Sequence, residues 1–299
     1  MKEQVLREGY LRMMDTKNTN PVQYFWTTVS YESDKGKAEA IFQEPLEMNA
    51  LVGKKLKLEF DGRIRCIDCG IPTKKSVNQG ACFGCFKKLA KHDMCILRPE
   101  TCHFHLGTCR DREWGKENCF KKHTVYLANT SGMKVGITKE VPVSNRWVDQ
   151  GAMQAIPIVE VDSRKKAGIV ETALSKFITD KSAWQRLVTS SPATVDLEKE
   201  KEKFVKYMQN NEFSAEIPID KDSDKGFEEE KIEFKVAKDK QTNLEYPILV
   251  YPKKAKSLKI DSPILSKLIG IKGQYLLFED GVINIRSHGG YFARLSLLS

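Results

Sequence analysis

The sequence predicts a multidomain α+β protein, in which β-rich terminal segments flank a zinc-binding module and a mixed α/β core. The 299-residue length favours more than one compact unit. All eight cysteines lie between Cys66 and Cys119, and the pattern after them alternates strands with helices. We therefore divide the chain into an N-terminal β segment (1–65), a zinc module (66–123), a core (124–212), and an acidic loop with a C-terminal β segment (213–299).

Composition narrows the class of protein. Hydrophobic residues make up 40% of the chain and can form a core, whereas the 30% of charged residues argue against a membrane protein. The first residues, MKEQVLREGYLRMMDTKN, contain no apolar leader. We expect a cytoplasmic protein.

The charge is unevenly distributed. The chain carries +9 overall, but residues 196–233 contain 13 acidic residues and 7 lysines, so the remainder carries +15. A basic surface attracts phosphate, which makes DNA or RNA the expected partner. The acidic stretch is expected to solvate a helix and a loop.

The N-terminal segment contains two strand-like runs, at residues 23–31 and 54–60. Asp61 and Gly62 follow the second run and are typical turn residues. We expect an antiparallel β segment that turns there into the zinc module.

The first four cysteines form two CxxC knuckles, Cys66-x2-Cys69 and Cys82-x2-Cys85. This spacing directs four thiolates at one tetrahedral ion and predicts a zinc site. A disulfide or redox pair is the alternative, but redox CxxC motifs usually occur singly, beside a βαβ unit.

A second group of candidate ligands follows the knuckles. Cys119 and His123 are one helical turn apart, and Cys102 and Cys109 can fold back to complete a site of three cysteines and one histidine. We expect these four to hold a second structural zinc ion. Cys95, His103 and His105 remain alternatives, as core residues, supporting residues or substitute ligands.

The core begins with a predicted hairpin, residues 124–130 and 133–139, around a Ser131-Gly132 turn. A helix follows over 144–153, with Ser144 as its N-cap, and then a strand over 155–161. A second helix is predicted over 164–178, with an apolar stripe. The stripe consists of Ala167, Val170, Leu174 and Phe177.

In the rest of the core, residues 184–212 are expected to be helical, and residues 213–233 are expected to form an acidic loop. The chain from Tyr246 onward again favours strands. Asp280-Gly281 predicts a hairpin turn between the strand-like runs QYLLFE and VINIR.

Four passages carry a resemblance to known families: CHFHLGTCRDREWG, HTVYLANTSGMKVGIT, RWVDQGA and GIKGQYLLFEDGVINIR. The chain resembles an uncharacterised bacterial and archaeal family of unknown function that joins cysteine knuckles to a core similar to GIY-YIG endonucleases. The order of hairpin, arginine-bearing helix and glutamate-bearing helix carries the second likeness.

This resemblance implies a metal-dependent nuclease. Tyr126 would activate water beside the scissile phosphate, and Glu171 would hold Mg²⁺ or another divalent ion. Arg146 would neutralise the phosphate, and Gly136 would let a backbone approach closely. Lys134 stands where the family has its second tyrosine and could lower the pKa of Tyr126.

A phosphate-binding face is also predicted from basic residues in the module and core. It comprises Arg110, Arg112, Lys121, Lys122, Arg164, Lys165 and Lys166. Three functions stay open at this point: a nuclease, a catalytically silent nucleic-acid-binding factor on the same fold, and a protein-interaction adaptor. A solvated surface explains the basic residues nearly as well.

Overall fold

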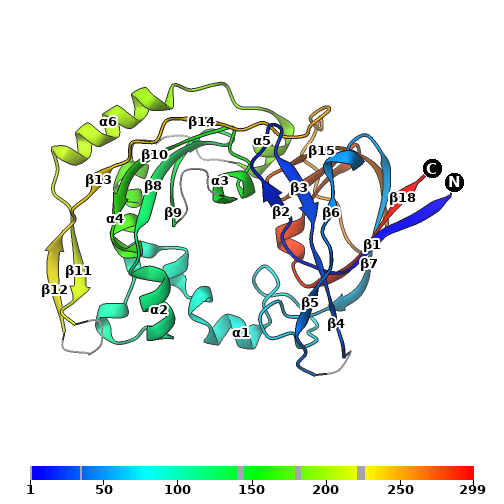
Figure 1. Ribbon diagram of the computed structural model, residues 1–299, viewed down its shortest axis with the longest axis horizontal. Helices are drawn as coiled ribbons and strands as arrows, with labels where there is room; N and C mark the ends of the chain where they lie inside the picture. Colours follow the sequence, from blue (N-terminus) through cyan, green and yellow to red (C-terminus); the bar gives the residue numbers. More distant parts are fainter. Residues whose placement is uncertain (1, 34–35, 140–144, 179–182, 221–225) are drawn as a thin grey trace.

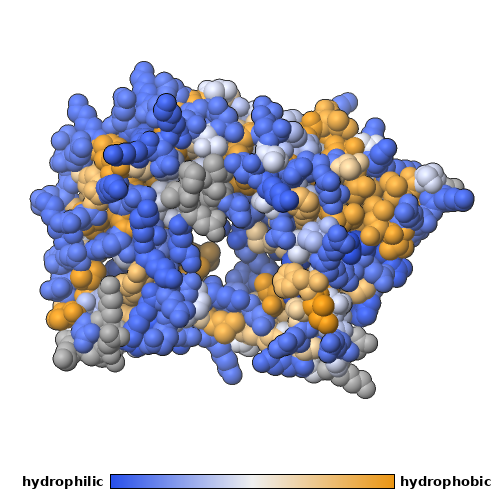
Figure 2. Space-filling view, viewed as in Figure 1, coloured by the Kyte–Doolittle hydropathy of each residue, from blue (hydrophilic) through white to orange (hydrophobic). Residues whose placement is uncertain are grey.

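The computed structural model describes residues 2–33, 36–139, 145–178, 183–220 and 226–299. It is an α+β fold with a curled eight-stranded antiparallel half-barrel, several smaller sheets and a four-cysteine cluster. The half-barrel and the core lie at opposite ends of the long axis, and the cysteine-rich segment connects them along one side (Figure 1). The space-filling view shows a hollow between the two ends (Figure 2).

The half-barrel is built from both ends of the chain. Its strand order is β17-β16-β15-β7-β18-β1-β4-β5. Strand β1 pairs antiparallel with β18, so the predicted N-terminal and C-terminal β segments share one sheet. Its strands are β1 (Glu3–Leu11), β4 (Thr28–Tyr31), β5 (Ala40–Phe42), β7 (Lys55–Ile64), β15 (Ile264–Lys272), β16 (Tyr275–Phe278), β17 (Gly281–Asn284) and β18 (Tyr291–Leu298).

Two details of the N-terminal segment differ from the prediction. The run 23–31 is divided: β3 (Gln23–Trp26) joins a small sheet with β2 (Asp15–Lys17) and β6 (Leu46–Glu47), whereas β4 joins the half-barrel. The predicted turn at Asp61-Gly62 is wrong, because β7 continues to Ile64. Phe60 pairs with Ala293 and Ile64 with Tyr291, so the intervening residues form a bulge that Gly62 permits with its φ of +86°.

The predicted core hairpin is confirmed as β8 (His123–Asn129) and β9 (Met133–Thr138). The strand predicted next is β10 (Gln154–Val161), which pairs with β8 and with the short strands β13 (Lys235–Val236) and β14 (Thr242–Asn243). One face of this sheet packs in a cluster with α4 (Arg164–Ser175) and α6 (Leu197–Gln209). The other face, which includes Tyr126, joins α3 (Asn145–Asp149) and the half-barrel in a separate cluster.

The helices of the core are shorter than predicted. Helix α3 ends at Asp149, and the expected N-cap Ser144 lies outside the described residues. Helix α4 ends at Ser175, so Phe177 lies beyond it, 54% exposed, and not on the buried stripe. The region 184–212 contains two helices, α5 (Trp184–Thr189) and α6, because Pro192 between them cannot continue a helix.

The acidic loop predicted over 213–233 is partly a hairpin, of β11 (Ser214–Pro218) and β12 (Phe227–Lys231). The predicted C-terminal hairpin is confirmed as β16 and β17, but its turn is Glu279-Asp280, because Gly281 already pairs with Phe278. Strands were expected from Tyr246 onward, whereas the first named strand after it in the described chain is β15. The zinc module contains α1 (Phe83–Lys88) and α2 (Arg112–Cys119). Short 3-10 helices lie at Asn49–Leu51, Ala90–His92, Met94–Ile96, Pro99–Thr101, Phe104–Leu106 and Ile285–His288.

Among the described helices, none combines the length and the apolar character needed to cross a membrane.

Candidate metal centre and cationic cavity

The four knuckle cysteines converge on one point. The Sγ atoms of Cys66, Cys69, Cys82 and Cys85 lie within 4.8 Å of one another, and those of Cys69 and Cys82 are 3.9 Å apart. A tetrahedral zinc ion with Zn–S bonds of about 2.3 Å requires sulfur atoms about 3.8 Å apart. The donor set and its spacing therefore fit Zn²⁺, and the predicted first zinc site is a four-cysteine centre.

Backbone N–H groups favour the thiolate at two of these sulfurs, whereas burial raises the pKa of Cys69 and of Cys85. The Cys82 backbone N–H donates to Cys66 Sγ at 3.2 Å, and the Cys85 N–H donates to Cys82 Sγ at 3.4 Å. Burial alone would raise the pKa of Cys82, but the Cys85 N–H and the neighbouring thiols outweigh it, so this pKa is lowered. Cys82 is also the N-cap of α1. The start of this helix thus fixes half of the site.

A second group of possible ligands lies nearby, and its members differ from the predicted set. Asp93, Cys95 and His103 offer ligand atoms within 4.8 Å of one another. Cys102 is adjacent, because its thiol interacts directly with that of Cys95. Among the described residues, the predicted ligands Cys102, Cys109, Cys119 and His123 do not form such a group, and that ligand set stays a prediction. The Nε2 atom of His123 is buried without a hydrogen-bond partner.

The residues predicted to be catalytic lie together, at the β9 edge of the core sheet. Tyr126 and Lys134 come from paired strands, Arg146 from α3 and Glu171 from α4. All four line one cavity of about 450 Å³. The cavity is wide enough for a phosphate and its flanking groups.

Gly136 has a local role that the sequence does not reveal. It lies directly opposite Tyr126 in the β8–β9 pair, and a Cβ there would come within 2.6 Å of the tyrosine Cζ and hydroxyl. The ring of Tyr126 therefore occupies the space that the missing side chain leaves. Trp147 contacts the same ring edge-to-face, and the hydroxyl donates to Gln150 Oε1 at 3.4 Å.

Burial shifts the ionisation of the lining residues. It raises the pKa of Glu171 to about 7 although Arg164, Arg146 and Lys134 oppose it, and it lowers that of Lys134 to about 8. It also raises the pKa of Tyr126 to about 12, which Arg146 only partly offsets. The cation that lowers the Tyr126 pKa is therefore Arg146, not the expected Lys134, and burial is the larger effect.

The cavity is strongly cationic. Its ionisable lining includes one carboxylate, Glu171, against five cations. The cations are Lys134, Lys139, Arg146, Arg164 and Arg286. Such an excess of positive charge in a recess favours an anionic ligand.

Sequence reasoning missed Lys139 and Arg286 as members of this cavity. Arg286 is the last residue of the passage GIKGQYLLFEDGVINIR, which carries the family resemblance. Its place in that passage is the one sequence feature that could have marked it as a site residue. Its place beside Arg146 depends on how the half-barrel meets the core, which the sequence does not encode locally.

The predicted basic face is dispersed. Arg164 lines the cavity, whereas four other members are ion-paired with carboxylates. These pairs are Arg110 with Asp93, Lys122 with Glu160, Lys165 with Glu216, and Lys166 with Asp162 and Glu230. Lys166 is buried, and Arg112 lies over the Phe104 ring. Lys121 is exposed.

The fold and the four-cysteine centre define a zinc-binding α+β protein built around a half-barrel. The chain matches the family described as protein of unknown function (DUF2797) over residues 53–293, and it belongs to that family. The match begins just before β7 and reaches β18. Comparisons with curated proteins and with solved structures found no match.

Proposed function

We propose that the protein is a metal-dependent endonuclease that cleaves phosphodiester bonds in DNA or RNA, with zinc serving structure. The observation that carries the proposal is that Tyr126, Lys134, Arg146 and Glu171, which come from one hairpin and two helices, line one cationic cavity. The likeness of their order to GIY-YIG endonucleases is what singled these residues out in the sequence and suggests the reaction.

The lining residues suit a phosphate and one divalent ion. Glu171 would hold the ion, since Mg²⁺ is commonly bound through one or two carboxylates together with substrate phosphates. The ion would supply Lewis acidity at the phosphate and lower the pKa of bound water. Arg146, Lys134 and Arg164 would bind the phosphate oxygens and stabilise charge that develops on them.

Tyr126 favours a second candidate function, a catalytically silent nucleic-acid-binding factor. With a pKa of about 12 its hydroxyl stays protonated at neutral pH and donates hydrogen bonds, so it is a weak general base in the free protein. Its complete burial against Gly136 also gives it a packing role. The nuclease would cleave the phosphodiester bond that it binds, whereas the silent factor would bind it without cleavage.

The test is a cleavage assay on single-stranded and duplex DNA and RNA with zinc-loaded protein and added Mg²⁺. Glu171→Gln should abolish cleavage and leave nucleic-acid affinity within about twofold, because the cationic residues remain. Glu202→Gln, at an exposed position on α6, is the matched control and should cleave at the wild-type rate. Tyr126→Phe keeps the ring over Gly136 and should lower turnover at least about tenfold.

Salt-sensitive binding without cleavage on any of these substrates would support the silent factor instead. Absence of both binding and cleavage would reject both candidates and leave the adaptor.

A further inference from the structure

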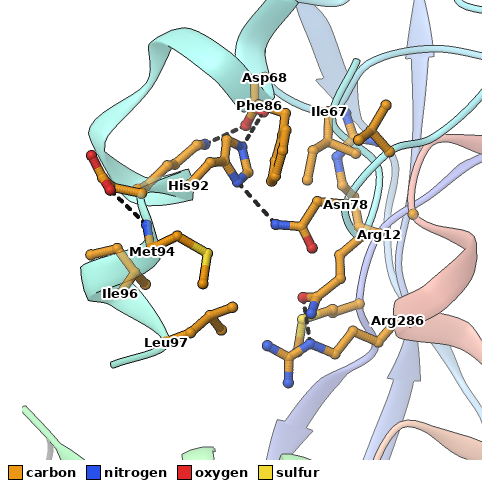
Figure 3. A pocket seen from close by; sticks show the side chains of 16 residues that line it. Arg12, Ile67, Asp68, Asn78, Phe86, His92, Met94, Ile96, Leu97 and Arg286 are labelled. Atoms are coloured by element: carbon orange, nitrogen blue, oxygen red, sulfur yellow. Dashed lines mark hydrogen bonds and ion pairs between the residues drawn. The ribbon is translucent and has the colours of Figure 1, made fainter. Parts of the chain in front are cut away.

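A second cavity, of about 460 Å³, adjoins the cationic cavity (Figure 3). It lies between the zinc module and the half-barrel. Ile96, Leu97 and Arg286 line both cavities, so the two are neighbours across a shared wall. The volume falls within the range of small-molecule sites.

One side of this cavity is apolar and partly open to solvent. Phe86 on α1 lines it together with Met94 and Leu97, and these two are 58% and 75% exposed. Figure 3 shows Phe86 above and Met94 and Leu97 on the module side. Large exposed apolar side chains that gather at a recess favour a flat, apolar ligand group.

The facing side presents an amide held in a fixed orientation. His92 Nε2 contacts Asp68 Oδ2 at 2.8 Å, and His92 Nδ1 contacts Asn78 Nδ2 at 3.3 Å. In the neutral tautomer whose Nε2–H donates to Asp68, Nδ1 accepts from the Asn78 amide. Asn78 then keeps Oδ1 and one N–H for a ligand, an acceptor beside a donor. Every nucleobase carries a complementary donor and acceptor on its edge.

Cations lie at the junction of the two cavities. Arg286 is oriented by donating from Nε to Gln79 Oε1 at 2.7 Å. It is close enough to Arg146 for the two guanidinium groups to repel each other, and the Asp149 carboxylate offsets part of this repulsion. A phosphate at the shared wall would relieve this repulsion.

We propose that this cavity binds one unpaired nucleotide of the substrate, with its base between Phe86 and the Asn78 amide and its phosphate at Arg286. The inference rests on the proposed nuclease and specifies its substrate class. A base inside a duplex cannot reach such a recess, so the substrate is single-stranded or has an unpaired nucleotide beside the cleaved bond. The zinc module would thus read the nucleotide next to the one that the core cleaves.

The experiment measures calorimetric binding of AMP, GMP, CMP and UMP to the zinc-loaded full chain, with ribose 5-phosphate and inorganic phosphate as baseless probes. At least one nucleotide should bind about tenfold more tightly than ribose 5-phosphate. Asn78→Ala should weaken that binding about tenfold. Asn211→Ala, at an exposed asparagine just after α6, is the matched control and should change nothing.

A second variant guards against a folding defect at Asn78, which lies beside the zinc knuckles. Met94→Glu alters an exposed side chain and places a carboxylate near the proposed nucleotide. It should weaken nucleotide binding at least about tenfold while zinc content stays at the wild-type value. The inference would be overturned if no nucleotide bound better than ribose 5-phosphate. It would also be overturned if both variants bound nucleotides as tightly as the wild type does.

The outcomes separate this inference from the proposed function. Loss of cleavage in Glu171→Gln, with nucleotide binding that ignores Asn78, would keep the nuclease and reject the nucleotide site. Nucleotide binding that depends on Asn78, without cleavage by the wild type, would keep the site and reject the nuclease.

Discussion

At the scale of single residues, burial decides the chemistry of the cationic cavity. Glu171 and Lys134 have ordinary pKa values well separated from neutrality, and burial brings both close to it. Arg146 and Arg164 add positive charge that keeps the Glu171 pKa from rising further. The cavity is therefore sensitive to small changes of pH around neutrality.

We expect the cleavage rate to pass through a maximum between about pH 7 and pH 8. Glu171 must lose its proton to hold the ion, so activity rises as the pH passes about 7. Lys134 must keep its proton to bind phosphate, so activity falls as the pH passes about 8. A pH–rate profile measures both limbs, and Lys134→Arg should move the alkaline limb upward. A flat profile from pH 6 to pH 9 would contradict these assignments.

The contact between Tyr126 and Gly136 gives a prediction about stability. Gly136→Ala should destabilise the protein by roughly 1–3 kcal/mol, since the added Cβ would overlap the tyrosine ring. Chemical denaturation measures this change in the free energy of unfolding. In a Tyr126→Leu background the same substitution should cost less, because the ring is gone. Equal costs in the two backgrounds would show that the ring contact is not the cause.

At the scale of elements, local motifs can be predicted from the sequence, whereas contacts between distant segments cannot. The CxxC spacing and the β8–β9 hairpin are local patterns, and both are found. The bulge at Asp61-Gly62 looks like a turn in the sequence, and only the neighbouring strand β18 makes it a bulge. In the same way, spacing alone suggests Cys119 and His123 as ligands, whereas folding gathers Asp93, Cys95 and His103. The place of Arg286 in the cavity likewise depends on how the half-barrel meets the core.

The zinc module should fold only with its metal. Cys82→Ser should remove the ion from the four-cysteine centre and unfold the knuckles, because binding energy at such sites is folding energy. For a second ion, the geometry leads us to expect that Cys95→Ser removes it and Cys119→Ser does not. Elemental analysis of reduced protein gives the zinc content of each variant. Wild-type protein without zinc would refute the four-cysteine site.

At the scale of the whole molecule, positive and negative charge lie in different parts of the sequence. Residues 196–233 carry −6 and the remainder +15, and the five cations of the cavity belong to that remainder. Four residues of the predicted basic face are already paired with carboxylates. Contact with phosphate is therefore expected at the cationic cavity more than over a broad face.

Nucleic-acid affinity should fall steeply with added salt. Counterion release predicts that a protein contacting about four phosphates of a single strand loses affinity with a logarithmic slope of about −3. Titrations between low and physiological salt measure this slope. Arg164→Gln should make it shallower by about 0.7, whereas Lys122→Gln, which breaks an exposed ion pair with Glu160, should leave it unchanged. Affinity that is independent of salt would exclude phosphate contact.

The pairing of β1 with β18 affects how the nascent chain can fold during translation. During translation β1 leaves the ribosome well before β18, the strand that covers most of its length. Its other neighbour, β4, pairs with it at only two positions. An uncovered strand edge invites association with other chains, so the N-terminal strands need protection by a chaperone or by slow, late closure of the sheet.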